Sequence, residues 1–125
     1  MEIINIEKLD GHKVIVMTGR NENVRKVAQY LKTGLFYFPR NEVYFMDYPD
    51  AIKEYQEILE YQSEPVVFTT QSKEFLDCLL ESDIDFIFAT VRQFKNYDED
   101  TYRLRVLTKE EALANRRDFN MELRF

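Results

Sequence analysis

Short apolar runs alternate with stretches of helical periodicity along this chain, and that alternation limits the fold more than any other feature. The runs with strand character cover residues 43–46, 66–69, 84–91 and 102–106. Between them, apolar residues recur at the spacing of one helix face, most clearly at Phe75, Leu76, Leu79 and Leu80. Strands that alternate with helices are joined by crossovers and pair in parallel. The pattern therefore predicts an α/β fold with a mostly parallel central sheet and flanking helices.

Both ends of the chain carry signals for antiparallel pairing. An alternating run at 3–9 is followed by an Asp-Gly pair and a second strand-like run at 13–18. This order predicts an N-terminal β-hairpin. Near the other end, the run at 102–106 follows that at 84–91 across a polar turn. These two runs are expected to pair as an antiparallel edge of the sheet.

Capping residues predict where the helices begin and end. Asn21 or Asn23 is expected to begin the first helix, because an Asn side chain accepts a hydrogen bond from a free backbone amide. Gly34 is its expected stop. Thr108 and Glu111 match a capping box, which predicts a final helix from this point.

Length, charge and residue counts narrow the class of protein. The 125 residues suit a single domain, 1–125, and the net charge of −6 argues against nucleic-acid binding by this chain alone. The nearest basic group consists of Arg103, Arg105, Arg116 and Arg117, with acidic residues around it. No apolar run approaches the roughly 20 residues of a membrane span, so we expect a cytoplasmic protein without a membrane segment.

The chain has one cysteine and one histidine, which excludes an internal disulfide and a typical structural zinc site. Cys78 occupies an apolar helical pattern and is expected to be a buried core residue. His12 follows a turn glycine and is expected to be exposed. The pattern therefore predicts no bound metal.

The apolar run at 43–46 ends in Asp47, Tyr48 and Pro49. This segment resembles the Walker B motif of ABC-type ATPases, in which the Asp holds magnesium and a following Glu positions the attacking water. Here Tyr48 replaces that Glu, and a phenol with a pKa near ~10 is a poor base at neutral pH. The alternative interpretation is that Asp47 caps a helix that begins at Pro49.

The run at 66–69 continues into Thr70, Gln71 and Ser72. It resembles the switch segment of the same ATPases, usually a buried strand followed by Thr-Thr-His-Ser, in which the His contacts the γ-phosphate. Gln71 replaces the His, and an amide cannot become cationic. The alternative interpretation is a strand end followed by a helix cap.

Together the two motifs resemble the C-terminal half of ABC-type, AAA-family (OLD-like) ATP-binding proteins, over residues 1–125. The resemblance implies half of a P-loop NTPase-like fold. It also places Asp47, Tyr48, Thr70 and Gln71 at degenerate nucleotide-site positions, clustered at the carboxyl ends of two adjacent parallel strands. The chain contains no Gly-x-x-x-x-Gly-Lys-Ser/Thr loop, and residues 19–23 do not match the family's Ser-Gly signature. We therefore expect no catalytic residue and no cofactor.

These departures favour a pseudo-ATPase that acts as a protein-interaction or regulatory module. The alternative is an ATPase subunit whose partner supplies the phosphate-binding loop, and a third possibility is an unrelated α/β binding domain. A detached half should leave sheet edge uncovered, so a homodimer or a protein partner is expected. Phe36, Tyr37 and Phe38 are the candidates for burial between chains, unless they fill the domain's own core.

Overall fold

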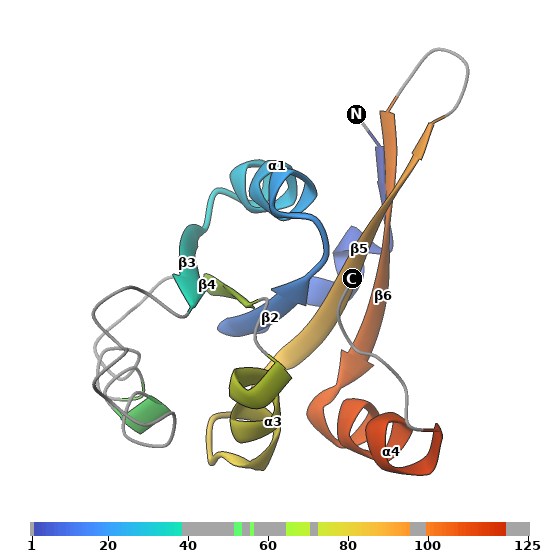
Figure 1. Ribbon diagram of the computed structural model, residues 1–125. Coiled ribbons are helices and arrows are strands. Elements are labelled where there is room, and N and C mark those ends of the chain that lie inside the picture. Colours follow the sequence, from blue (N-terminus) through green and yellow to red (C-terminus); the bar gives the residue numbers. More distant parts are fainter. Residues whose placement is uncertain are drawn as a thin grey trace.

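The chain folds around one six-stranded sheet, seen in a computed structural model that describes residues 2–38, 52–53, 56, 65–70, 73–95 and 100–119 (Figure 1). The strands are β1 (Glu2–Ile4), β2 (Val14–Thr18), β3 (Gly34–Phe38), β4 (Val66–Thr70), β5 (Ile87–Lys95) and β6 (Asp100–Thr108). Their order across the sheet is β1-β6-β5-β2-β4-β3. Strands β5, β2, β4 and β3 pair in parallel, which confirms the predicted α/β fold with a mostly parallel sheet.

Helices cover both faces of this sheet, because alternate residues of each strand project to opposite sides. Helix α1 (Asn21–Leu31) lies on one face, and α3 (Lys73–Glu81) and α4 (Lys109–Phe119) lie on the other (Figure 1). Val24 and Val27 of α1 pack with Ile15 and Met17 of β2. The helical set predicted at Phe75, Leu76, Leu79 and Leu80 is buried in the opposite cluster, with Val16, Phe68 and Phe88.

The predicted N-terminal hairpin is wrong. Strand β1 pairs in parallel with β6, whereas β2 lies between β4 and β5. Residues Ile6–Leu9 form a 3-10 helix instead of continuing a strand. Asn5 turns the chain before it, with a left-handed φ of 73°, and its Nδ2 donates a hydrogen bond to the Leu104 carbonyl of β6 at 3.1 Å. Every residue of β2 is buried, and an apolar strand gains more burial at the centre of a parallel sheet than in a terminal hairpin.

The first helix is correctly predicted, but both of its ends differ from the expectation. The N-cap is Arg20, without a side-chain hydrogen bond, so neither Asn21 nor Asn23 caps the helix. The helix ends at Lys32, which adopts a left-handed φ of 56°. Lys32 N–H donates to the Gln29 carbonyl and Thr33 N–H donates to the Ala28 carbonyl, the two bonds of a Schellman motif. Gly34 is therefore not the stop and begins β3.

The C-terminal half agrees more closely with the sequence. Strands β5 and β6 pair antiparallel, as expected, with Phe88 opposite Leu107. The edge on this side is β1 rather than β6, because β1 pairs with the outer side of β6. The capping box is confirmed: Thr108 N–H donates to Glu111 Oε1 at 3.3 Å, and Glu111 N–H donates to Thr108 Oγ1 at 3.1 Å.

The helix expected after Pro49 falls mostly outside the described residues. Within that stretch, Ile52, Lys53 and Gln56 are helical, and Ile52 is buried in the cluster beneath α3. Among the helices that the structure describes, none is long and apolar enough to cross a membrane.

Candidate functional site

The carboxyl ends of the parallel strands are the first place to look for a site, because ligands of open α/β sheets collect there. Of the four predicted site residues, Thr70 is the last residue of β4 and is buried. It lies opposite Phe38, the last residue of β3. Asp47, Tyr48 and Gln71 lie outside the described residues, so their clustering with Thr70 stays a prediction.

The strand expected at 43–46 also lies outside the described residues. In the described sheet, the two neighbours of β4 are β2 and β3. Strand β3 is not predicted from the sequence, in which Gly34 is the expected helix stop and Phe36, Tyr37 and Phe38 are candidates for burial between chains. Both lateral positions beside the switch-like strand are thus taken by strands of this chain.

Three threonines form a row across β5, β2 and β4, which we call the threonine row: Thr90 in the interior of β5, and Thr18 and Thr70 at the carboxyl ends of β2 and β4. Thr18 and Thr90 are register partners, and their Oγ1 atoms are 3.3 Å apart. Val16 of β2 pairs with Phe68 of β4, so two residues further on Thr18 and Thr70 are level with each other. All three side chains share the α3 face, because Val16, Phe68 and Phe88 belong to the cluster on that face.

Gly19 lets the chain leave β2 close to β5. Its φ of 142° is one that residues with a side chain rarely adopt. A Cβ added at this position would lie 2.8 Å from the Val91 carbonyl oxygen, which is backbone and cannot rotate away. Gly19 therefore has a structural reason to be glycine that does not depend on a ligand.

Two buried hydroxyls lack a hydrogen-bond partner among the described residues: Thr69 Oγ1 of β4 and the Tyr102 hydroxyl of β6. Tyr102 lies in the cluster beneath α1, and Lys26 Nζ is 6.0 Å from its ring centroid. Val67 of β4 belongs to the same cluster, and Thr69, two residues later, projects to the same side of the strand. The hydroxyls of Thr69 and Tyr102 are therefore both on the α1 face. Buried polar groups without partners destabilise a fold, and neither group contributes to the threonine row on the opposite face.

The chemistry of the described site is limited to hydrogen bonding. A threonine hydroxyl donates one hydrogen bond and accepts two, but it neither titrates near neutral pH nor carries charge. Within the described ranges, no group of three or more His, Cys, Asp or Glu side chains could hold a metal ion.

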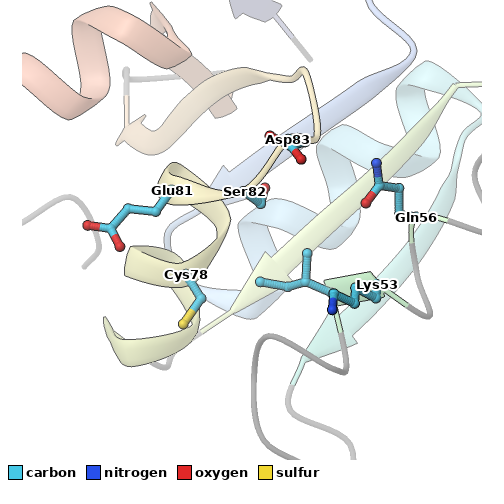
Figure 2. Close-up of a pocket in the computed structure, with 7 residues that line it drawn as sticks. Lys53, Gln56, Cys78, Glu81, Ser82 and Asp83 are labelled. Atoms are coloured by element: carbon cyan, nitrogen blue, oxygen red, sulfur yellow. The ribbon is translucent and has the colours of Figure 1, made fainter.

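A cavity of about 320 Å³ lies at the other end of the sheet. It lies between α3 with its following turn and the helical residues near 52–56 (Figure 2). Its lining is Ile52, Lys53, Gln56, Cys78, Glu81, Ser82 and Asp83. Residues 81–83 precede β5, which places the cavity at the amino ends of the strands. It is therefore separate from the threonine row.

The two isolated residues considered from sequence have ordinary positions. His12 is exposed after the Asp10-Gly11 turn, as expected. Cys78 forms no disulfide and is half-buried rather than buried, because one side packs on the core and the other lines the cavity (Figure 2).

Thr18 and Thr90 are not among the site residues predicted from the sequence, although a signal was present. Strands β2 and β4 end in Thr18 and Thr70, and the apolar run predicted at 84–91 has Thr90 as its second-to-last residue. A polar residue at the carboxyl end of each apolar run is the pattern that could have identified the row.

Comparisons with known proteins give no match to a family model, to a curated protein or to a solved structure.

Proposed function

We propose that this chain is a non-catalytic, ABC-type ATPase-like domain that acts as a protein-interaction or regulatory module. The threonine row carries the proposal. Thr18, Thr70 and Thr90 are 0%, 2% and 6% exposed, and the hydroxyls of Thr18 and Thr90 lie within hydrogen-bond distance of each other. Phosphate groups are bound by donors that point toward the ligand, often with a nearby cation. Hydroxyls buried in the domain do not meet that need.

The sequence supports the same conclusion from another direction. Tyr48 stands where the resemblance implies a Glu, and Gln71 stands where it implies a His. A Gly-rich loop with its Lys is missing from the sequence. Phosphoryl transfer is catalysed almost entirely by positioning and charge stabilisation, so these replacements remove its main sources.

The alternative is an ATPase subunit whose partner supplies the phosphate-binding loop. Such a partner must reach the carboxyl end of β4. Because β2 and β3 flank β4, a partner strand has no lateral position to occupy there. The topology therefore weighs only against a partner that adds its own strand beside β4.

A protein partner or a second copy of the chain is the occupant that the sheet edge supports. Within the described sheet, β3 is an edge strand. Its five residues include no charge and no proline, two devices by which proteins protect an exposed edge from pairing. The side chains of Phe36, Tyr37 and Phe38 lie outside the described part of the structure, so their burial between chains remains a prediction.

The test is an ATPase assay on the purified chain, repeated with Asp47→Ala. We expect no turnover above background with magnesium and ATP, and no change on substitution. A pull-down from native extract should recover a protein partner. Turnover by the chain alone that Asp47→Ala abolishes would reject the non-catalytic proposal, and turnover that appears only when a recovered partner is added would favour the subunit alternative.

A further inference from the structure

Three arginines lie together on one face of the β5–β6 ribbon: Arg92, Arg103 and Arg105, which we call the arginine face. Arg92 is the register partner of Arg103, and Arg105 pairs with Thr90. Arg103 and Arg105 are two residues apart on β6, so they share a side of the strand. The next pair on the same side of the ribbon, two residues from the Thr90–Arg105 pair on each strand, is Phe88 and Leu107. Both pack in the cluster beneath α3 and α4. The arginine face is therefore on the same side of the sheet as α4.

All three arginine side chains are exposed. Helix α4 packs at the end of the ribbon near Leu107, where Ala112 and Leu113 join the core. Figure 1 shows β5 and β6 continuing from there as a long ribbon beyond the strands of the sheet centre. The register places Arg92 and Arg103 on this continuing part, beyond the Thr18–Thr90 pair, and Arg105 level with that pair.

These three positive charges occur on a chain whose net charge is −6, and Glu2 of β1, the register partner of Thr101, lies on the same face. In the sequence, Arg103 and Arg105 are grouped with Arg116 and Arg117, whereas the strand register brings Arg92 beside the first two. The side chains of Arg116 and Arg117 are outside the described part of the structure. A nucleic acid would gain from three guanidinium groups but would be repelled by the acidic remainder of the chain. A short acidic protein segment gains the same contacts with less of that repulsion.

We propose that the arginine face binds an extended acidic segment of a partner protein, with carboxylates at alternate positions. Side chains two residues apart in a strand are separated by about 6.5–7 Å, on the segment as on β6. One carboxylate can then meet Arg105 while the next lies between Arg92 and Arg103, whose Cβ atoms are about 4.5–5.5 Å apart across the strands. The guanidinium group suits this role because its planar fork binds a carboxylate through two parallel hydrogen bonds. The inference rests on the proposed function as an interaction module, since it names the class of partner.

The experiment measures binding of a dye-labelled peptide of repeating Glu-Thr pairs by fluorescence anisotropy. A second peptide, of repeating Glu-Glu-Thr-Thr, has the same composition and charge, but each face of the extended chain carries Glu only at every fourth residue. We expect the first peptide to bind about three- to tenfold more tightly, with affinity falling as salt is raised.

The variant Arg103→Glu with Arg105→Glu should weaken binding of the Glu-Thr peptide about tenfold or more. The matched control is the double variant Arg20→Glu with Arg25→Glu, at two exposed arginines beside and on α1. It changes the net charge by the same amount and should reduce the affinity for the Glu-Thr peptide less than about threefold. Replacement of Arg103 and Arg105 by Lys keeps the charge but removes the planar guanidinium groups. The affinity of this variant for the Glu-Thr peptide should therefore lie between those of the wild type and the charge-reversed variant. Melting temperatures of all variants show that the fold is retained.

The outcomes separate this inference from the proposed function. Equal binding of the two peptides, or equal loss in the two charge-reversed variants, would overturn the arginine face as a specific site. A single-stranded oligonucleotide that binds more tightly than the peptide, with the same dependence on Arg103 and Arg105, would also overturn it. If the variant Arg103→Glu with Arg105→Glu still captures the partner found in the pull-down, the proposed interaction function is supported and the arginine face is rejected as the binding site. If the wild-type chain captures no partner and stays monomeric, the proposed function itself fails.

Discussion

Individual residues fix the places where this chain changes direction. Asn5 and Lys32 adopt left-handed conformations at the ends of β1 and α1, and both positions are closed by hydrogen bonds across the turn. Gly11 and Gly19 also have positive φ values, but for different reasons. Gly11 has open space around it, whereas Gly19 lies against the backbone of β5. The cost of adding a methyl group should therefore differ between the two glycines.

Gly19→Ala is expected to destabilise the fold by about 3–5 kcal/mol, because strain at an unfavourable φ adds to a clash that requires β2 or β5 to move. Gly11→Ala is the control, since its strain of about 1–2 kcal/mol comes from φ alone. Urea unfolding followed by circular dichroism measures both values. Equal costs would show that the contact with Val91 does not constrain the path from β2 into α1.

At the scale of elements, a lysine joins two helices on the same face of the sheet. Lys109, the first residue of α4, donates hydrogen bonds to the carbonyls of Ser82 and Ile84, the latter at 2.8 Å. Its Nζ also lies 5.3 Å from the centroid of the Phe86 ring. These carbonyls follow the end of α3, where a positive charge complements the helix dipole. Lys109 thus holds α4 against the segment that leads from α3 into β5.

Lys109→Met is expected to lower the free energy of unfolding by about 1.5–3 kcal/mol, because two part-buried carbonyls lose a charged donor while the aliphatic stem is retained. The matched control is Lys26→Met on α1. Lys26 makes an exposed ion pair with Glu22 at 3.9 Å, and its Nζ lies 6.0 Å from the centroid of the Tyr102 ring, so its loss should cost less, about 0.5–1 kcal/mol. Similar losses in both variants, measured by urea unfolding, would exclude a special role for Lys109.

At the scale of the whole molecule, the open question is how the edges of the sheet are used. In the described sheet, β1 is an edge of only three residues, which limits what can pair with it. Strand β3 is the other edge and is longer and apolar. Tyr30 of α1 is 55% exposed and is the one large hydrophobic residue exposed in the described part of the chain. Edge pairing is therefore better supported than association through an apolar surface.

We expect the wild-type chain to be a dimer at micromolar concentration, as measured by light scattering. Tyr37→Lys places a charge on the β3 edge and should shift the mass to that of one chain, since a charged edge resists pairing. Tyr30→Lys is the control, because it adds the same charge on exposed α1 and should leave the dimer intact. A wild-type monomer across this concentration range would contradict pairing through β3.

The sequence by itself determined the features that depend on neighbours along the chain. The runs predicted at 66–69 and 13–18, which correspond to β4 and β2, the buried face of α3 and the capping box at Thr108 each follow from local spacing and local hydrogen bonding. The α/β class followed as well, because helices between apolar strands require parallel pairing. Of the candidate site, only Thr70 lies in the described residues, and its position at the end of β4 agrees with the sequence.

Tertiary structure decided everything that joins distant residues. The alternating run at 3–9 predicted a strand, but only its first residues belong to β1, and the pairing of β1 with β6 joins residues about a hundred positions apart. The same is true of the threonine row and the arginine face, whose members are brought together by strand order and register. Register is set by how the two faces of the sheet pack against helices, and that packing is a property of the assembled domain rather than of any one segment.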